Sequence, residues 1–254
     1  MKQDIFTLKG KTALVTGGYR GIGRAVAESM ANAGSNIVIW DLFDATDIAA
    51  WIEHNYQVKA TAFICDVTNP AQVEKTIEAS AQFTGSLDIL FNNAGIGPHK
   101  DALEVLPEEW LKVMNVNING IFYVATAFGR YLTRENKKGS IINTASMSGL
   151  IVNIPQKQAS YNASKAAVIQ LTKTLAVEWA NKGIRVNCIS PGYIQTDLIK
   201  EVREDWREEW TSMIPFGRMG KPEELAGAVI YLASDAASYT SGCNIVIDGC
   251  YTLI

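Results

Sequence analysis

KTALVTGGYRGIG, residues 11–23, carries the clearest structural signal in this chain. Lys11 to Thr16 is a short apolar run typical of a buried strand, and a helical apolar pattern follows the glycines until Gly34. Glycines permit a tight turn, and a helix N-terminus offers unpaired N–H groups to a pyrophosphate. The spacing is G-x-x-x-G-x-G, which differs from the G-x-G-x-x-G of the general dinucleotide fingerprint. A strand, a dinucleotide-binding turn and a helix are therefore expected here.

An acidic residue ends the second predicted strand, residues 36–40. Asp41 stands 24 residues beyond Gly17, a position suited to the adenosine ribose hydroxyls. A carboxylate there repels a 2′-phosphate, and the residues that follow include no basic side chain. The cofactor is therefore predicted to be NAD rather than NADP. Arg20 is the one residue that favours NADP, and Asp41 has an alternative interpretation as a strand-end cap.

Strands and helices alternate along the rest of the chain. Further strands are predicted at residues 58–65, 87–91, 139–145, 184–189 and 244–248, and helices at 44–54, 70–83, 107–134, 161–182 and 222–234. We expect residues 1–254 to form one domain, with residues 195–216 as a small helical lid over the substrate side.

Two further strand ends carry candidate cofactor contacts. Asp66, followed by Val67, is placed to hydrogen-bond an adenine amino group, although an Asp in this position is also a common turn residue. The next strand leads into Asn92-Asn93-Ala94-Gly95, where small residues let backbone approach a ligand. A purely structural turn is compatible with the same residues.

The candidate chemistry lies in Ser160-Tyr161-Asn162-Ala163-Ser164-Lys165. Residues at i and i+4 share a helix face, so the Tyr161 phenol and the Lys165 ammonium lie together. A nearby cation is expected to lower the phenol pKa from its usual value of about 10. Ser146 ends a predicted central strand and faces the same crevice. An ordinary amphipathic Tyr and Lys pair is the alternative.

Composition excludes several other classes. The chain has 254 residues, 48% hydrophobic and 19% charged, with a net charge of −3, so no basic surface suggests nucleic acid. Four cysteines without C-x-x-C spacing, two of them in predicted buried strands, indicate reduced thiols and no metal site. No apolar run is long enough for a membrane helix, and the N-terminus lacks a secretory pattern. A cytoplasmic protein is expected.

The motifs taken together resemble the short-chain dehydrogenase/reductase family. They are Thr16-Gly-x-x-x-Gly-x-Gly23, Asn92-Asn-Ala-Gly95, Ser146, Tyr161-x-x-x-Lys165 and Pro191-Gly192, and they occur in order over nearly the whole chain. The resemblance implies a single-domain α/β fold, a Rossmann-like doubly wound sheet of seven mostly parallel strands with helices on both faces, and a homotetramer.

The resemblance also implies site residues. The catalytic residues would be Asn117, Ser146, Tyr161 and Lys165, with Asn117 chosen because Val116-Asn117-x-x-Gly120 matches the family frame. The cofactor would contact Gly17, Arg20, Gly21, Ile22, Gly23, Asp41, Asp66, Val67, Asn93, Ala94, Gly95, Tyr161, Lys165, Pro191, Gly192, Ile194 and Thr196.

The serine requires a choice, because many relatives place it 13 residues before the tyrosine. That spacing selects Ser148, whereas alignment of the strand end selects Ser146, 15 residues before Tyr161. We expect Ser146, because the loop after it can absorb two residues and the strand cannot.

The substrate is expected to be a polyol or a ketose. Residues 146–156, 175–180 and 248–252 resemble those of sugar-alcohol dehydrogenases, such as galactitol, sorbitol or threitol dehydrogenases. Asn153 and Gln156 would bind the substrate with Ser146 and Tyr161, although both amides could instead stabilise their loop. A 3-oxoacyl-carrier-protein reductase is the alternative enzyme, against which Asp41 and the acidic lid argue. A catalytically silent NAD-binding sensor is the non-enzymatic alternative.

Overall fold

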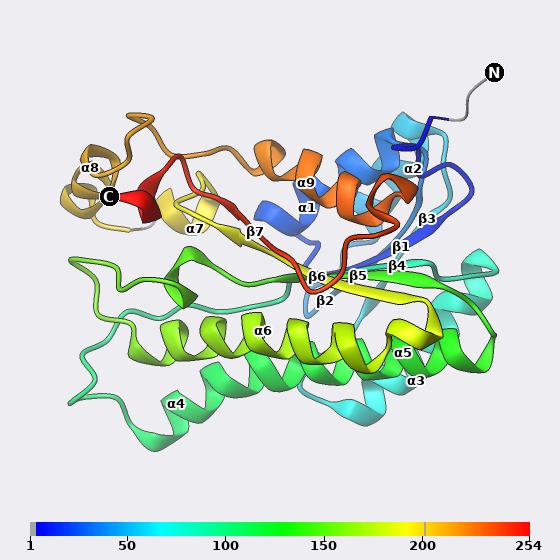
Figure 1. The fold of residues 1–254 in the computed structure, drawn as a ribbon, viewed down its shortest axis with the longest axis horizontal. Helices are drawn as coiled ribbons and strands as arrows, with labels where there is room; N and C mark the ends of the chain where they lie inside the picture. The colour runs from blue at the N-terminus through cyan, green and yellow to red at the C-terminus, as the bar shows by residue number, and fades with distance from the viewer. Residues whose placement is uncertain (1–3, 201) are drawn as a thin grey trace.

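The sheet of this protein runs through the centre of the molecule (Figure 1). The computed structural model describes residues 4–200 and 202–254, and within them seven parallel strands form one sheet in the order β3-β2-β1-β4-β5-β6-β7. The strands are β1 (Thr12–Thr16), β2 (Asn36–Asp41), β3 (Ala60–Ile64), β4 (Ile89–Asn92), β5 (Gly139–Thr144), β6 (Ile184–Pro191) and β7 (Asn244–Ile247). The doubly wound α/β prediction is confirmed, with a sheet that is parallel throughout this part of the chain.

Helices cover both faces of the sheet (Figure 1). One face carries α1 (Gly21–Asn32), α2 (Thr46–Tyr56) and α9 (Ala226–Ala233); the other carries α3 (Pro70–Thr84), α4 (Pro107–Met114), α5 (Ile121–Arg134) and α6 (Ala159–Glu178). Because successive strand residues point to opposite faces, Ala13 and Val15 pack in one apolar core and Leu14 packs in the other. This burial on both sides explains why the strand sequences are almost uniformly apolar.

The predicted helix at 107–134 is not a uniform α-helix. A π-helical turn, Asn115–Gly120, separates α4 from α5. Such turns are rare and frequent at functional sites. Here the turn contains the asparagines whose helix propensity is poor, and its Asn117 side chain is completely buried. The apolar pattern continues through both kinds of helix, which is why the sequence indicated one element.

The segment predicted to be a lid, residues 195–216, leaves the sheet after β6. It contains α7 (Asp197–Lys200) and α8 (Glu204–Ser212), which lie at the end of the molecule near the C-terminus (Figure 1).

Strand order reverses between β1 and β4, which are neighbours although two strands separate them in sequence. In open α/β sheets, ligands bind at the carboxyl ends of the strands that flank such a reversal. The reversal therefore locates the candidate site.

The next features are the cysteines, the hydropathy of the helices and the grouping of possible metal ligands. Cys65 and Cys188 are buried free thiols, and burial raises the pKa of each to about 11. None of the helices in residues 4–200 and 202–254 is both long and apolar enough to cross a membrane. Over the same ranges, no three His, Cys, Asp or Glu side chains are grouped so as to hold a metal ion.

Candidate active site

The glycine turn after β1 forms a cradle that only glycine can line. Gly17 and Gly21 have positive φ angles of 66° and 59°. A Cβ on Gly23 would lie 2.0 Å from the Gly17 carbonyl oxygen, so no larger residue fits there. Helix α1 begins at Gly21, and the side chain of Arg20 before it makes no capping hydrogen bond. The exposed N–H groups of this turn therefore fit a pyrophosphate.

Hydrogen bonds join β1 to the segment after β4 at the point where the strand order reverses. The Thr16 hydroxyl accepts hydrogen bonds from the backbone N–H groups of Asn93 and Ala94, at 2.9 and 3.0 Å. The Asn93 amide donates to the Thr16 carbonyl at 3.2 Å. A Cβ on Gly17 would lie 3.0 Å from the Ala94 Cα, so the two segments are in direct contact. The predicted cofactor residues of both motifs thus meet at one edge of the sheet.

Asp41 lies at the end of β2 beside the glycine turn. Its Oδ2 accepts a hydrogen bond from the Tyr19 N–H at 3.0 Å, and its Oδ1 accepts one from the Phe43 N–H at 3.2 Å. Trp40, the residue before it, is buried and donates its Nε1–H to Ser80 at 2.9 Å. The carboxylate is therefore held at the position where an adenosine ribose would lie.

Asn117 connects the π-helical turn to the loop after β4. Its Oδ1 accepts a hydrogen bond from the Ile96 N–H, and its Nδ2 donates to the Ile96 carbonyl, both at 2.8 Å. Nδ2 also donates to the Ser164 hydroxyl at 3.0 Å. A Cβ on Gly95 would lie 3.3 Å from Asn117 Oδ1 and 3.6 Å from Lys165 Nζ. Asn117, Gly95 and Lys165 are therefore immediate neighbours.

Tyr161 and Lys165 share a face of α6, as their spacing predicts. Lys165 Nζ lies 5.6 Å from the centroid of the Tyr161 ring and donates to the Thr144 carbonyl at 2.7 Å. Only 3% of Lys165 is exposed, and burial lowers its pKa to about 8.

The pKa of Tyr161 differs from expectation. In the protein alone, burial raises this pKa, while the Ser146 hydroxyl acts to lower it. The expected depression by Lys165 is not seen: burial has the larger effect on this pKa, and Ser146 rather than Lys165 is the group that lowers it.

Ser146 rather than Ser148 faces the tyrosine. The Ser146 hydroxyl is hydrogen-bonded to the Tyr161 side chain, a contact that lowers the Tyr161 pKa. The Ser148 hydroxyl instead accepts a hydrogen bond from Gln158 at 3.2 Å. Gly149 makes this arrangement possible, because a Cβ there would lie 2.7 Å from the Lys165 carbonyl carbon. The segment after β5 thus packs directly on the backbone of α6. This geometry supports the choice of Ser146 made from the strand end.

The remaining predicted cofactor residues occupy three places. Thr196 lies over the glycine turn, since a Cβ on Gly21 would be 3.5 Å from its Cγ2. Asp66 accepts two hydrogen bonds from Thr68, so it forms a turn, and its proposed adenine contact stays a prediction. Of the others, Ile22, Val67, Pro191, Gly192 and Ile194 are buried or half-buried at strand and helix ends.

The predicted substrate residues Asn153 and Gln156 lie in a buried network beyond Ser146. Asn153 accepts from Gln158 at 3.1 Å and donates to Tyr193 at 3.3 Å. Gln156 donates to the Tyr193 hydroxyl and accepts from Trp210, both at 2.8 Å. Both amides therefore already have protein partners, which favours their alternative, loop-stabilising interpretation. Sequence reasoning missed Gln158 and Tyr193, of which Tyr193 directly after Pro191-Gly192 was the available signal, whereas Trp210 was expected to be buried in the core of the lid.

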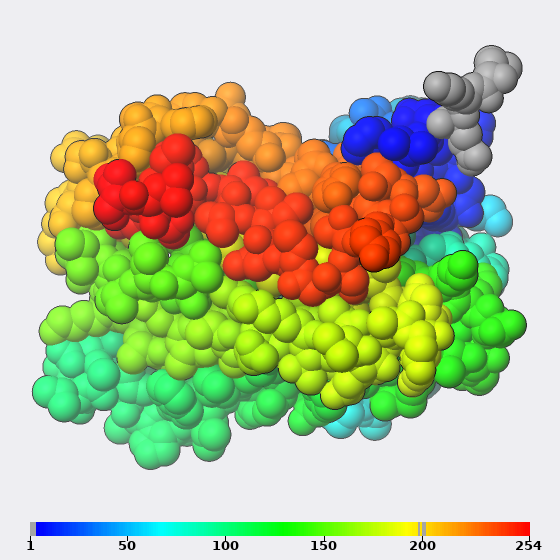
Figure 2. Space-filling model, viewed as in Figure 1, coloured from blue at the N-terminus to red at the C-terminus, as the bar shows by residue number. Residues whose placement is uncertain are grey.

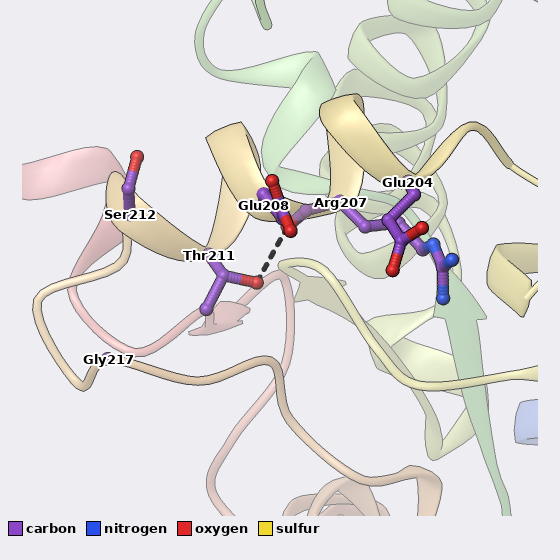
Figure 3. Close-up of a pocket in the computed structure, with 6 residues that line it drawn as sticks. All are labelled: Glu204, Arg207, Glu208, Thr211, Ser212 and Gly217. Carbon is purple, nitrogen blue, oxygen red and sulfur yellow. Dashed lines mark hydrogen bonds between the residues drawn. The ribbon is translucent and has the colours of Figure 1, made fainter.

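A depression lies on and beside α8 (Figure 3). It is lined by Glu204, Arg207, Glu208, Thr211, Ser212 and Gly217. Glu204, Glu208 and Thr211 share a face of α8. Since this depression contains no predicted site residue, we place the candidate active site at the strand ends instead.

Comparisons with known proteins agree with this architecture. The family described as Enoyl-(Acyl carrier protein) reductase matches residues 17–252. A sorbose reductase of Candida albicans is 47% identical over 254 residues, which cover 98% of this chain and 89% of that protein. A probable NADP-dependent mannitol dehydrogenase of Yarrowia lipolytica is 47% identical over 251 residues, covering 97% and 89% of the two chains.

A solved structure shows the same fold. The crystal structure of a short-chain type dehydrogenase/reductase from Mycobacterium marinum has a TM-score of 0.96 and 43% identity, with 99% of each chain covered.

The buried amine of Lys165 makes a prediction about stability. Its pKa is about 8 when folded, against 10.5 for an ordinary lysine, so the unfolded chain binds more protons between these values. Wild-type stability should therefore rise as the pH rises from 8 to 10.5. Lys165→Met should be more stable than wild type at pH 7, by at most about 3 kcal/mol, and the gain should vanish near pH 10.5.

Urea unfolding of both proteins from pH 6 to 10.5 measures this difference. Lys173→Met is the matched control, because Lys173 is exposed on the same helix and should leave the pH slope unchanged. If Lys165→Met had the same pH dependence of stability as the wild type, the lowered pKa of Lys165 in the folded protein would be contradicted.

Proposed function

The chain belongs to the short-chain dehydrogenase/reductase family of oxidoreductases acting on CH–OH groups, and from this membership we propose its reaction and cofactor. It interconverts a secondary alcohol of a polyol or sugar with the corresponding ketone, using NAD. The observation that carries this proposal is the meeting of Asn117, Ser146, Tyr161 and Lys165 beside the glycine turn, at the point where strand order reverses.

Each of these side chains has a role in the proposed reaction. The Tyr161 hydroxyl takes the proton of the substrate alcohol, and in the reverse direction it returns a proton to the ketone oxygen. Ser146 hydrogen-bonds the same oxygen and stabilises negative charge that develops there. Lys165 supplies positive charge beneath the Tyr161 ring and is held by the Thr144 carbonyl. Asn117 fixes the loop after β4 against α6.

The cofactor site fits a dinucleotide by its shape and its hydrogen-bond donors. A dinucleotide bound there would supply the acceptor for the hydride of the carbinol carbon. The glycine turn and the N-terminus of α1 would hold the pyrophosphate, and Asp41 would hold the adenosine ribose. The Asp41 carboxylate supports NAD, because it would repel the 2′-phosphate of NADP. The NADP dependence stated for the Yarrowia relative is the opposing observation.

The substrate class rests on the relatives. Sorbose and mannitol are the substrates named for the two similar proteins, and each is a polyhydroxylated chain.

The proposal extends to assembly and location. We propose one domain with its lid, a cytoplasmic homotetramer and no nucleic-acid or membrane partner. Phe122 on α5 and Val246 on the edge strand β7 are exposed apolar side chains that subunit contacts would cover.

Reduction of NAD and NADP, followed at 340 nm with a panel of polyols, tests the function. We expect turnover of a polyol with NAD in clear preference to NADP, and Asp41→Ser should reduce that preference by about tenfold or more, since it removes the repelling charge. Preference for NADP in the wild type would overturn the cofactor assignment. Reduction of a 3-oxoacyl substrate without polyol turnover would support the carrier-protein alternative, and binding of NAD without any turnover would support the sensor.

Two serine variants test the site more finely. Ser146→Ala should lower kcat by about 10²-fold or more, because it removes a donor to the reacting oxygen. Ser148→Ala is the matched control two residues away and should change kcat by less than about tenfold, because its hydroxyl serves Gln158. Steady-state kinetics with the best polyol from the panel measure both. The reverse order of effects would show that Ser148 is the catalytic serine.

A further inference from the structure

The lid helix α8 packs on the body of the protein through Trp210, and the half-buried Trp206 packs against the same apolar cluster. Among its described residues, Trp210 is the one that is fully buried, with 1% of it exposed. Charged residues such as Glu204, Asp205 and Glu208 make up much of the remaining helix surface. A nine-residue helix of this kind has little stability of its own, so its position depends on how Trp210 is held.

Trp210 is held by two groups from different parts of the chain. Its Nε1–H donates to Gln156 Oε1 at 2.8 Å, and its ring stacks on Tyr193 with centroids 4.4 Å apart and planes at 11°. Gln156 lies in the loop that follows the serine-bearing strand β5, and Tyr193 lies just beyond β6. The lid is thereby joined to the two segments that border the substrate side of the crevice.

The amide of Gln156 uses both of its ends in this connection. While its oxygen accepts from Trp210, its Nε2 donates to the Tyr193 hydroxyl at 2.8 Å, and only 5% of the residue is exposed. Breaking either bond would leave a buried polar group without its partner, which is costly. The three side chains therefore form a closed unit of one stacking contact and two hydrogen bonds.

The same face of α8 also reaches the loop after β4. His99 in that loop makes edge contacts with Trp206, at 5.4 Å between centroids, and with Trp210, at 6.3 Å. Two residues earlier in the loop, a Cβ on Gly97 would lie 3.2 Å from the Tyr161 ring. The lid therefore closes against a loop that is itself packed on the proposed catalytic tyrosine.

The space-filling view agrees with this arrangement (Figure 2). The lid, the loop after β5 and the C-terminal residues adjoin at one end of the molecule. Tyr251 from the C-terminal segment packs edge-on against Tyr193 at 5.3 Å and donates to the Met213 sulfur at 3.8 Å. The end of α8 is thus joined to the same cluster.

We propose that Gln156 is a positioning residue that sets substrate affinity by fastening the lid through Trp210. In this role Gln156 does not touch the substrate. It keeps α8 against the body so that Trp206 and His99 complete the substrate side of the crevice. The statement about substrate affinity rests on the proposed function, whereas the statement about the lid does not.

Two variants distinguish a role of Gln156 in holding the lid from direct binding of substrate by Gln156. Trp210→Phe keeps an aromatic ring to stack on Tyr193 and removes the N–H donor together with part of the indole ring, and Gln156→Leu removes the amide at similar volume. Each should raise KM for the polyol by about 3- to 10-fold while kcat changes less than twofold, the pattern of lost binding without lost chemistry. The double variant should match Gln156→Leu rather than multiply the two effects, because that substitution already removes the bond to Trp210 as well as the bond to Tyr193.

Hydrogen exchange provides a readout that needs no turnover. In both variants the amides of residues 204–212 should exchange at least about tenfold faster than in wild type, and those of α6 should not change. Trp51→Phe is the matched control, since Trp51 is half-exposed on α2 and contacts Tyr56 rather than the lid. It should leave both KM and lid exchange at wild-type values.

The opposite outcomes overturn the proposal. A higher KM in Gln156→Leu with an unchanged KM in Trp210→Phe would make Gln156 a direct substrate contact. Multiplied effects in the double variant would show that the two side chains do not act through the bond between them. Unchanged exchange of residues 204–212 in Trp210→Phe would show that the bond does not fasten the lid. If the wild type oxidises no alcohol, the proposed function fails. The exchange measurement then still tests whether the bond between Gln156 and Trp210 holds α8 against the body.

Discussion

The arrangement of this site depends on one buried hydrogen bond, from the Lys165 ammonium to the Thr144 carbonyl. It joins the first turns of α6 to the end of β5 and carries Tyr161 to the edge where the strands end. The approach is so close that Gly149 has no room for a Cβ, which would lie 2.7 Å from the Lys165 carbonyl carbon. Glycine at this position follows from the packing of the segment after β5 on α6, because a Cβ would push α6 away from the strand ends.

The buried charge also shows how the site and the fold oppose each other. Burial makes the charged form of Lys165 unfavourable, and it makes the ionised form of Tyr161 unfavourable as well. The parallel sheet tolerates this because its two apolar cores supply most of the stability. Polar groups collect where the strands end, and there the lid and the loop after β5 add a second cluster of buried amides and aromatic rings.

Local sequence patterns predicted the features that depend on neighbouring residues. The glycine turn, the alternation of strands and helices, and the shared helix face of Tyr161 and Lys165 could all be found in this way. The π-helical turn at Asn115–Gly120 could not, since its apolar pattern resembles that of an α-helix. The raised pKa of Tyr161 depends on burial by distant segments. The partners of Gln156 lie 37 and 54 residues away, so its amide seemed free to bind substrate.

The central claim is that the Tyr161 hydroxyl exchanges a proton with the substrate alcohol. Replacing Tyr161 by Phe removes that hydroxyl and keeps the ring that packs on Gly97. The most direct measurement is kcat for polyol oxidation by this variant, with NAD affinity determined separately by titration. The account predicts a loss of about 10²- to 10⁴-fold in kcat with NAD affinity within a few-fold of wild type. A kcat within about tenfold of wild type would contradict it.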